Sequence, residues 1–357
     1  MRLLCCYLFL VSCSQFGRLP TGERLAAMQN SPNYDKDKAT FLNLYSHPPT
    51  KHWRKKAKSW FMRRFINTDG LRPDYLLPEG DSQLQRFSLA DSKAKTIWLG
   101  HSTVLLNING KTILFDPVFS DHASPVPIIV KRFQPPALSL QALPPIDYIV
   151  ISHDHYDHLD KETIRFFVDQ KAIRFLVPLG VGEHLVYWGV EPERIKAMDW
   201  WEEYWADGLR FVATPSHHFS GRTPWAKDKT LWASWVVASE QQRIYFSGDS
   251  GYSEHFKQIG DRLGPFTLAY LDSGQYNERW AQAHLLPRYF AQAFKDLRAE
   301  WYFPIHWSMF CLSVHSWHEP AEKLQHEADA GNINLITPKL GEMVVIGDGY
   351  ESQTWWR

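Results

Sequence analysis

Three histidines and two aspartates lie within the six residues His153-Asp-His-Tyr-Asp-His158. The preceding residues 146–152 are mostly apolar and end in a serine, which predicts a short buried strand that runs into a polar loop. Imidazoles and carboxylates are zinc ligands, and a catalytic zinc lowers the pKa of its bound water to about 7. The segment therefore predicts hydrolytic chemistry at neutral pH. The alternative is a polar loop that is rich in histidine without binding a metal.

The spacing within this segment favours two metal positions. His153 and His155 are two residues apart, so an extended or tightly turned loop can aim both imidazoles in one direction. Asp157 and His158 would then face a second position a few ångströms away. A single ion would not use all four side chains.

Further candidate ligands follow later apolar runs, each of which predicts a strand. The runs and the residues that follow them are 211–214 before His217 and His218, 243–246 before Asp249, and 301–303 before His306. Two metal ions need more ligands than the first segment supplies. These strand ends supply them.

Taken together, these motifs resemble the metallo-β-lactamase fold superfamily, and most closely its branch typified by N-acylphosphatidylethanolamine-hydrolysing phospholipase D. The resemblance runs from about residue 45 to residue 345. It is carried by Trp98-Leu-Gly-His101-Ser-Thr-Val-Leu-Leu106, Phe115-Asp-Pro-Val-Phe-Ser120, Thr214 to Arg222, Thr230-Leu-Trp232 and Gly248-Asp-Ser-Gly-Tyr252. The resemblance implies an α/β fold, a four-layer αββα sandwich, with a dinuclear metal site.

The resemblance also implies two Zn²⁺ per chain and a ligand set for them. The implied ligands are His153, His155 and His218 for one ion, Asp157, His158 and His306 for the other, and Asp249 bridging the two. His218 is favoured over His217 because relatives carry a non-ligand polar residue before the histidine. Asp157 is expected to act in catalysis as well as in metal binding.

Three other polar residues resemble functional positions of the branch. Asp116 corresponds to an aspartate that orients the metal loop, and its alternative is an ordinary turn residue before Pro117. His101 would face the same site from a strand end, although a structural histidine is an equal alternative. His284 resembles a position near the substrate pocket, which predicts a catalytic role. The remaining histidines, including His184, are expected to be packed or surface residues without partners.

Two segments near the expected pocket depart from the branch pattern. Residues 271–277 contain Leu-Asp-Ser-Gly-Gln-Tyr-Asn where relatives usually carry a more apolar Pro-Ile-Gly-Ala-Tyr, and Trp-Ser-Met-Phe at residues 307–310 replaces Trp-Gly-Thr-Phe. Because the implied ligands are unchanged, these departures affect the substrate rather than the chemistry.

Length and composition agree with one large enzyme domain. The chain has 357 residues, 44% of them hydrophobic, and a formal net charge of zero, so it can bury a full core. It lacks the excess of positive charge that is typical of nucleic-acid binding. Its 16 tryptophans are unusual, and apart from core packing they suit membrane interfaces and apolar grooves.

The first 13 residues predict a lipoprotein-type signal peptide. Arg2 precedes an apolar run over residues 3–11 that is too short to span a membrane as a helix. Residues 10–13, Leu-Val-Ser-Cys, resemble a bacterial lipobox, with Cys13 as the lipidated residue. We therefore expect a bacterial cell-envelope protein that is lipid-anchored, on the periplasmic side of the outer membrane. A plain signal peptide or an uncleaved anchor are the alternatives.

Residues 14–50 are expected to form a polar tether, and residues 51–357 the hydrolase domain. The domain would begin with a basic amphipathic helix, because residues 51–65 contain seven Lys or Arg and no acidic residue, with apolar residues at helical spacing. This helix would contact anionic lipid headgroups. The alternative is a helix packed on the domain with its basic face in water.

Three functional hypotheses follow. The first is a dizinc phosphodiesterase of the phospholipase D type, which acts at a membrane surface and cleaves N-acylphosphatidylethanolamine to N-acylethanolamine and phosphatidic acid. The second is a lactonase or another ester or phosphodiester hydrolase of the same fold. The third is a non-enzymatic envelope lipoprotein, against which the complete ligand set argues. The sequence leaves the oligomeric state open.

Overall fold

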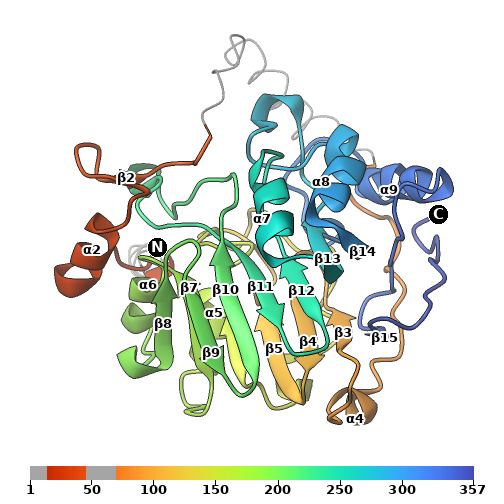
Figure 1. Cartoon of the computed structure of the whole chain (residues 1–357), viewed down its shortest axis with the longest axis horizontal. Coiled ribbons are helices and arrows are strands. Elements are labelled where there is room, and N and C mark those ends of the chain that lie inside the picture. The colour runs from red at the N-terminus through yellow and green to blue at the C-terminus, as the bar shows by residue number, and fades with distance from the viewer. Residues whose placement is uncertain (1–13, 46–69) are drawn as a thin grey trace, which may run out of the picture.

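The computed structural model describes residues 14–45 and 70–357 (Figure 1). The predicted signal peptide with Cys13 and the predicted basic helix over residues 51–65 lie outside the described residues. Among the residues described, no helix has both the length and the apolar character needed to cross a membrane.

Two mixed β-sheets form the centre of the molecule. The first contains β3 (Lys95–Trp98), β4 (Val104–Ile108), β5 (Lys111–Phe115), β6 (Tyr148–Val150), β7 (Arg174–Pro178), β8 (Ile195–Met198) and β15 (Met343–Val345). The second contains β9 (Glu203–Ala206), β10 (Leu209–Thr214), β11 (Ser234–Ala238), β12 (Arg243–Phe246), β13 (Phe266–Asp272) and β14 (Ala299–Ile305). Their spatial orders are β15-β3-β4-β5-β6-β7-β8 and β14-β13-β12-β11-β10-β9.

The two sheets pack face to face around the main apolar core. Phe115 of β5 stacks on Phe246 of β12 with ring centroids 4.5 Å apart, and both belong to a core cluster that draws on both sheets. Every residue of β4 and β11 is buried, because each sheet is covered on both faces. That double coverage explains why these strands are mostly apolar, with Asn107 and Ser234 as the polar exceptions, instead of alternating apolar and polar residues.

Helices cover the outer face of each sheet and complete four layers. On the seven-stranded sheet they are α4 (Leu84–Phe87), α5 (Lys161–Phe166) and α6 (Gly182–Tyr187), and on the six-stranded sheet they are α7 (His255–Leu263), α8 (Phe290–Leu297) and α9 (Glu319–Asp329). In α8 the buried residues Phe290, Ala293, Phe294 and Leu297 recur at helical spacing and form one apolar face. The predicted αββα sandwich is confirmed.

Short 3-10 turns connect several of these elements. They lie at Leu140–Ala142, Pro192–Arg194, Pro224–Ala226, Glu278–Trp280 and Pro287–Tyr289. Three of them begin with proline, which suits the first helical position because proline has no N–H to leave unpaired.

The prediction of a tether is wrong for residues 14–45. This segment contains the helix α2 (Gly22–Gln29) and the paired strands β1 (Tyr34–Asp35) and β2 (Thr40–Phe41), which lie at the left margin of Figure 1. Met28, Tyr34 and Phe41 belong to the main apolar core, and Met28 and Phe41 are only 2% and 1% exposed. The polar composition suggested a tether, but a few well-spaced apolar side chains fix the segment on the domain.

Candidate metal centre

The candidate ligands lie where strands of both sheets end. In the seven-stranded sheet β5 and β6 run parallel, so Asp116 and the loop that begins at Ser152 leave the same edge. In the six-stranded sheet β12, β13 and β14 run parallel, and Asp249, Asp272 and His306 lie at or just beyond their carboxyl ends. Parallel pairing thus collects at one edge residues that are far apart in the sequence.

A first group of ligand atoms lies within 4.8 Å of one another and consists of His153, His155, His218 and Asp249. Nε2 of His153 lies 2.8 Å from Nδ1 of His155, and Nε2 of His218 lies 3.2 Å from that same Nδ1. Burial lowers the pKa of all three imidazoles. They are therefore neutral at pH 7, which is the form that binds a metal.

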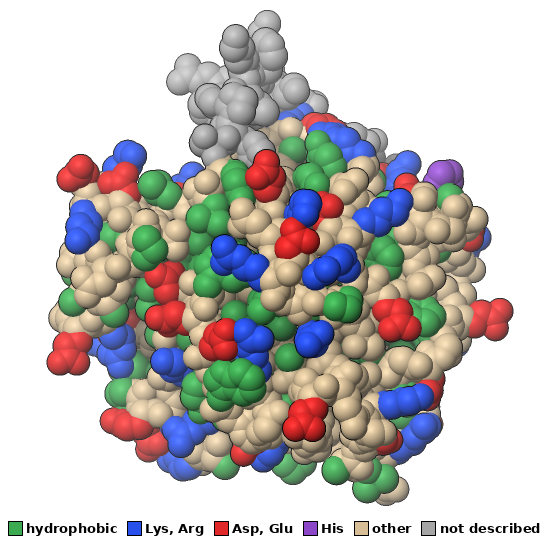
Figure 2. Space-filling view, viewed as in Figure 1, with side chains coloured by type: hydrophobic (Ala, Val, Ile, Leu, Met, Phe, Trp, Pro, Cys, Tyr) green, Lys and Arg blue, Asp and Glu red, His purple; other side chains and the backbone are tan. Residues whose placement is uncertain are grey.

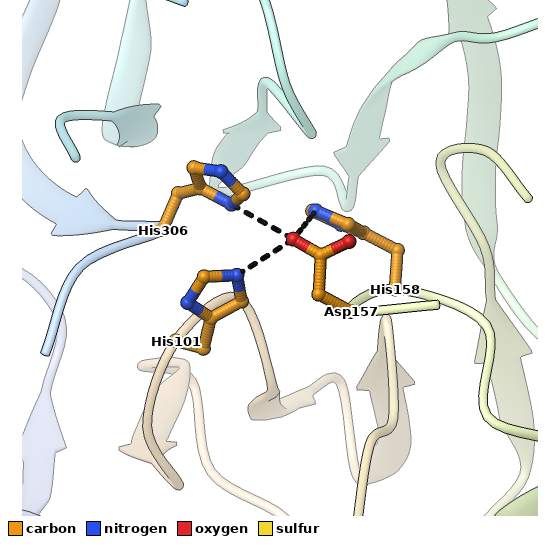
Figure 3. A group of neighbouring side chains, drawn as sticks. All are labelled: His101, Asp157, His158 and His306. Atoms are coloured by element: carbon orange, nitrogen blue, oxygen red, sulfur yellow. Dashed lines mark hydrogen bonds and ion pairs between the residues drawn. The ribbon is translucent and has the colours of Figure 1, made fainter. Parts of the chain in front are cut away.

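A second group consists of His101, Asp157, His158 and His306. Figure 3 shows the three imidazoles turned toward the carboxylate of Asp157. Oδ2 of Asp157 lies 3.0 Å from Nε2 of His101, 3.5 Å from Nε2 of His158 and 4.0 Å from Nδ1 of His306. His101, which the sequence placed only at a strand end facing the site, lies inside this group.

Asp249 faces both groups. Its Oδ2 lies 3.8 Å from Nε2 of His153 and 3.6 Å from Nε2 of His218. Its Oδ1 lies 3.1 Å from Nε2 of His158 and 3.0 Å from Nδ1 of His306. Burial opposes ionisation of Asp249, but His158 and His306 lower its pKa well below the usual range, so the carboxylate is charged. One charged carboxylate with an oxygen on each group has the geometry of a bridging ligand.

The buried polar atoms at this position fit metal ions. Within residues 14–45 and 70–357, Nε2 of His158 and Oδ1 of Asp249 are buried without a hydrogen-bond partner. Such atoms are costly to bury unless something satisfies them, and a cation bound by both the nitrogen and the oxygen would do so. Each group supplies imidazole nitrogens and a carboxylate, which is the donor set of zinc sites.

Asp116 supports the second group from behind. Its Oδ2 lies 2.7 Å from Nδ1 of His158, and its carboxylate accepts hydrogen bonds from the backbone N–H and hydroxyl of Ser152 at 2.7 and 2.6 Å. A carboxylate that accepts the Nδ1–H of a histidine turns the other ring nitrogen toward the metal position. Asp116 is fully buried, as this orienting role requires.

Backbone conformation at the site is unusual. His101, Asp116 and His306 have φ angles of 54°, 39° and 65°, in the left-handed region that non-glycine residues rarely adopt. Gly248 has φ 55°, and a Cβ there would lie 2.5 Å from Cβ of Ser152. Glycine is therefore required where the loop that carries Asp249 meets the loop that carries the histidines.

The neighbouring histidines at positions 217 and 218 point to different surroundings. His218 joins the first group, and its Nδ1 lies 2.8 Å from the carbonyl oxygen of Ala283. His217 belongs to none of the ligand groups among the described residues. Its ring nitrogens lie 2.6 Å from the carbonyl oxygen of Gln282 and 3.0 Å from that of Tyr45.

A third group contains a residue that the sequence analysis missed. Asp249, Asp272, His284 and His306 lie together, and Nδ1 of His284 is 2.9 Å from Oδ2 of Asp272. Burial raises the pKa of Asp272 well above its usual value. Asp272 ends an apolar strand just as Asp116 and Asp249 follow theirs, and that pattern was the available signal. His284 is held 3.9 Å from Oδ2 of Asp249, at the margin of the first two groups.

The expectation that His184 has no partner is wrong. Its Nε2 lies 3.2 Å from Oδ2 of Asp154, and both side chains are buried. Asp154 also accepts hydrogen bonds from the hydroxyl of Thr230 at 2.8 Å and the N–H of Gly221 at 2.7 Å. Asp154 lies between His153 and His155 in sequence, so this network fixes the metal loop on the side away from its ligands.

A protein-family model matches the part of the chain that contains most of the candidate ligands. The model of the Beta-lactamase superfamily domain matches residues 111–307, more than half of the chain. The matched range includes every residue of the three ligand groups except His101.

Three relatives illustrate what the chain is similar to. An uncharacterized protein of Mycobacterium tuberculosis is 38% identical over 336 residues, covering 93% of this chain and 89% of the relative. N-acyl-phosphatidylethanolamine-hydrolyzing phospholipase D 1 of Caenorhabditis elegans is 33% identical over 265 residues, covering 69% of this chain and 74% of that protein. Outer membrane protein RomA of Klebsiella pneumoniae is 48% identical over 101 residues, covering 28% of this chain and 76% of that protein.

Proposed function

Because the chain belongs to the metallo-β-lactamase fold superfamily, in the branch of the N-acylphosphatidylethanolamine-hydrolysing phospholipases D, we propose that it is a dizinc phosphodiesterase. Its fold is that of a metal-dependent hydrolase, and it presents groups of histidine and aspartate that can bind metal. The proposed reaction converts N-acylphosphatidylethanolamine to N-acylethanolamine and phosphatidic acid. The observation that carries the proposal is Asp249, whose two oxygens face two separate ligand groups.

The proposed ligand roles follow the two groups. His153, His155 and His218 would hold one ion, Asp157, His158 and His306 would hold the other, and Asp249 would contribute to both. When bound, two zinc ions would supply an activated water at neutral pH and offset the negative charge of a phosphate. Asp116 keeps Nε2 of His158 directed at the site through its contact with Nδ1.

Two residues are proposed to act on the substrate and on water. Burial opposes ionisation of Asp157, but His158 and His101 lower its pKa well below the usual range, so the charged carboxylate can orient an attacking water. The side chain of His284 is 13% exposed, and its Nδ1 lies 2.9 Å from Oδ2 of Asp272. Burial lowers the pKa of His284, so we assign the neutral imidazole to take the proton that the attacking water releases and to pass it to the oxygen of the departing N-acylethanolamine.

The cavity next to the ligands favours a lipid phosphodiester. It has a volume of about 590 Å³ and is lined by Asn43, His218, Phe219, Lys227, Tyr252 and Arg288, among others. Aromatic side chains suit an acyl chain, and cations suit a phosphate. The same cavity gives a small lactone much less to contact.

The departures from the branch pattern bear on the second hypothesis, a lactonase or other ester hydrolase. Gln275 is buried and accepts hydrogen bonds from the N–H groups of Leu312 and Ser313, so this departure stabilises a loop. Asp272 also belongs to a departing segment, and its carboxylate lies in the third ligand group. The ligand groups also argue against the third hypothesis, a non-enzymatic lipoprotein, because such a role needs no metal centre.

The sequence of residues 1–13 bears on the cellular location of the protein. We propose a lipid anchor on Cys13 in the bacterial envelope, with the protein on the periplasmic side of the outer membrane. The similarity to an outer membrane protein of Klebsiella pneumoniae over 101 residues supports an envelope location. The proposed contact of the basic residues 51–65 with anionic lipid adds a second attachment.

Product analysis tests the proposed reaction. Full-length protein loaded with zinc is incubated with vesicles that contain N-acylphosphatidylethanolamine, and the lipids are identified by mass spectrometry. We expect N-acylethanolamine and phosphatidic acid in equal amounts, and neither product with an Asp249→Asn variant. Turnover of lactones without release of phosphatidic acid from the phospholipid would instead support the second hypothesis.

A further inference from the structure

We propose that a rim of exposed apolar side chains beside the metal centre docks on an anionic phospholipid bilayer. We name it the docking rim. Its exposed members are Leu42, Leu44, Tyr187, Phe219 and Trp225, and the half-buried Phe16 completes it. This inference rests on the proposed lipid substrate and adds to it the face of the protein that meets the membrane.

The rim exposes side chains that soluble proteins usually bury. Trp225 is 70% exposed, Leu42 and Tyr187 are each 45% exposed, and Leu44 and Phe219 are 42% and 39% exposed. Single exposed apolar residues are ordinary, but a series of large ones beside a cavity marks an interaction surface. On the face shown in Figure 2, acidic and basic side chains are interspersed with hydrophobic ones.

Contacts join the rim to the metal centre. The ring of Phe219 lies 4.6 Å, centroid to centroid, from both His155 and His218. Leu42 and Leu44 flank Asn43, whose side chain exchanges hydrogen bonds with the backbone of His218 at 2.8 and 3.1 Å. A lipid held at this rim would therefore have its phosphate next to the candidate ligands.

The rest of the rim extends away from the metal centre along neighbouring segments. Trp225 follows Phe219 closely in the chain, and its ring lies 6.5 Å from that of Phe16, centroid to centroid. Phe16 is in turn two residues from Arg18, whose guanidinium lies 5.7 Å from the centroid of the Tyr187 ring. These contacts place Phe16, Trp225 and Tyr187 on neighbouring segments, whereas other exposed apolar side chains, such as Leu76 and Ile128, are not part of the rim.

Cations accompany the rim and favour an anionic partner. Nζ of Lys227 lies 5.9 Å from the centroid of the Phe219 ring. Arg18 and Arg24 both pair with the single carboxylate of Glu183, so this trio keeps one excess positive charge. Aromatic side chains mixed with Lys and Arg are typical of protein surfaces that lie in the headgroup region of a bilayer.

The segment that starts at Ser14 is fixed at this same rim. The carbonyl oxygen of Ser14 accepts a hydrogen bond from the indole of Trp188 at 2.9 Å, and its hydroxyl accepts one from Lys161 at 2.8 Å. The carbonyl oxygen of Gln15 accepts one from Arg222 at 2.9 Å. Because Cys13 is bonded directly to Ser14, a lipid on Cys13 would begin beside the rim. That position favours a bilayer as the occupant of the rim.

Gly17 makes this fixed position possible. Its φ is 69°, and a Cβ there would lie 2.1 Å from Nδ1 of His184. The next residue, Arg18, donates its backbone N–H to that Nδ1 at 3.1 Å. The N-terminal segment is therefore held against the same His184 that pairs with Asp154 of the metal loop.

A pair of tryptophans provides a matched test. Trp225 is 70% exposed on the rim, and Trp205 is 67% exposed on β9, the outermost strand of the six-stranded sheet. In full-length protein, each is replaced by cysteine (Trp225→Cys or Trp205→Cys) and labelled with an environment-sensitive fluorophore, with labelled wild-type protein as background. The proteins are bound to vesicles of phosphatidylethanolamine and phosphatidylglycerol that contain nitroxide-labelled lipid.

We expect the fluorophore at position 225 to be quenched several-fold more strongly than the one at position 205. Equal quenching at both positions would overturn the proposal. A change at position 225 that depends on protein concentration and occurs without vesicles would also overturn it, by making a second copy of the chain the occupant. The vesicles contain no N-acylated lipid, so the result does not depend on whether the proposed cleavage reaction is correct.

Discussion

Asp249 faces both ligand groups with a single carboxylate, and its charge is the property that would offset the two proposed cations. Asp249→Asn keeps the shape of the side chain and removes the charge. We expect wild-type protein to hold about two zinc ions per chain and the Asn variant about one or fewer, measured by elemental analysis after dialysis. His217→Gln is the control and should keep both ions, because His217 contacts backbone carbonyls outside the groups. Two tightly held ions in the Asn variant would disprove the bridging role.

His255 couples stability to pH. It is fully buried against Ser250 and Ser253, and burial lowers its pKa to about 3. Between pH 6.5 and pH 3, His255 is therefore protonated in the unfolded chain and neutral in the folded chain. The stabilising contribution is complete above pH 6.5 and falls by about 1.4 kcal/mol for each pH unit below it.

Urea unfolding between pH 7.5 and pH 5 checks this dependence. A His255→Asn variant should lose free energy of unfolding less steeply with acidification, by about 1 kcal/mol per pH unit relative to wild type. His101, whose pKa burial also lowers to about 3, remains in both proteins and cancels in the comparison. Parallel pH profiles would show that His255 does not titrate as described.

At the scale of elements, Gly248 allows the loop that carries Asp249 to approach the loop that begins at Ser152. Gly248 and Gly331 have φ angles of 55° and 72°, but a Cβ at Gly331 would meet nothing within 4 Å. Gly331→Ala should therefore lower the free energy of unfolding by about 1 kcal/mol, from backbone strain alone. Gly248→Ala should lower it by about 1–3 kcal/mol more, because its Cβ would collide with Ser152. Denaturant titration of both variants measures the difference, and equal losses would remove the steric explanation.

The strand ends show what the sequence could predict. Apolar runs followed by His153, Asp249 and His306 were visible as strands that stop at ligands, and the superfamily and the αββα layers are confirmed. The left-handed backbone at His101 and Asp116 was not predictable, because tertiary contacts impose it against local preference. A sequence pattern predicts where a strand ends but not the backbone conformation of the residue that follows it.

Long-range pairing accounts for most of what was missed. His184 and Asp154 are 30 residues apart, and neither belongs to a sequence motif that predicts their contact. Residues 14–45 were interpreted as a tether because their composition is polar. Their burial depends on where Met28 and Phe41 meet the core, which only the folded chain defines.

At the scale of the whole molecule, the metal centre joins the two sheets. In the first two groups His101, His153 and His158 follow strands of the seven-stranded sheet, whereas His218, Asp249 and His306 follow strands of the six-stranded sheet. Metal removal should therefore loosen the sandwich at this edge. We expect a chelator to lower the Tm of wild-type protein by on the order of 5–10 °C, because binding to the folded state alone stabilises it.

Differential scanning fluorimetry with and without chelator measures this effect. The Asp249→Asn variant should show a smaller shift than wild type, since it has less metal to lose. Added zinc should restore the wild-type Tm. A Tm unaffected by the chelator, in protein that elemental analysis shows to be stripped, would mean that the sheets hold together without the ions.

The hydrogen bond between Arg18 and His184 spans 166 residues, and this separation constrains the order of events during synthesis. The N-terminal segment is made first, but Trp188, His184 and Arg222, to which it binds, are made much later. It must therefore stay undocked while more than half of the chain is translated.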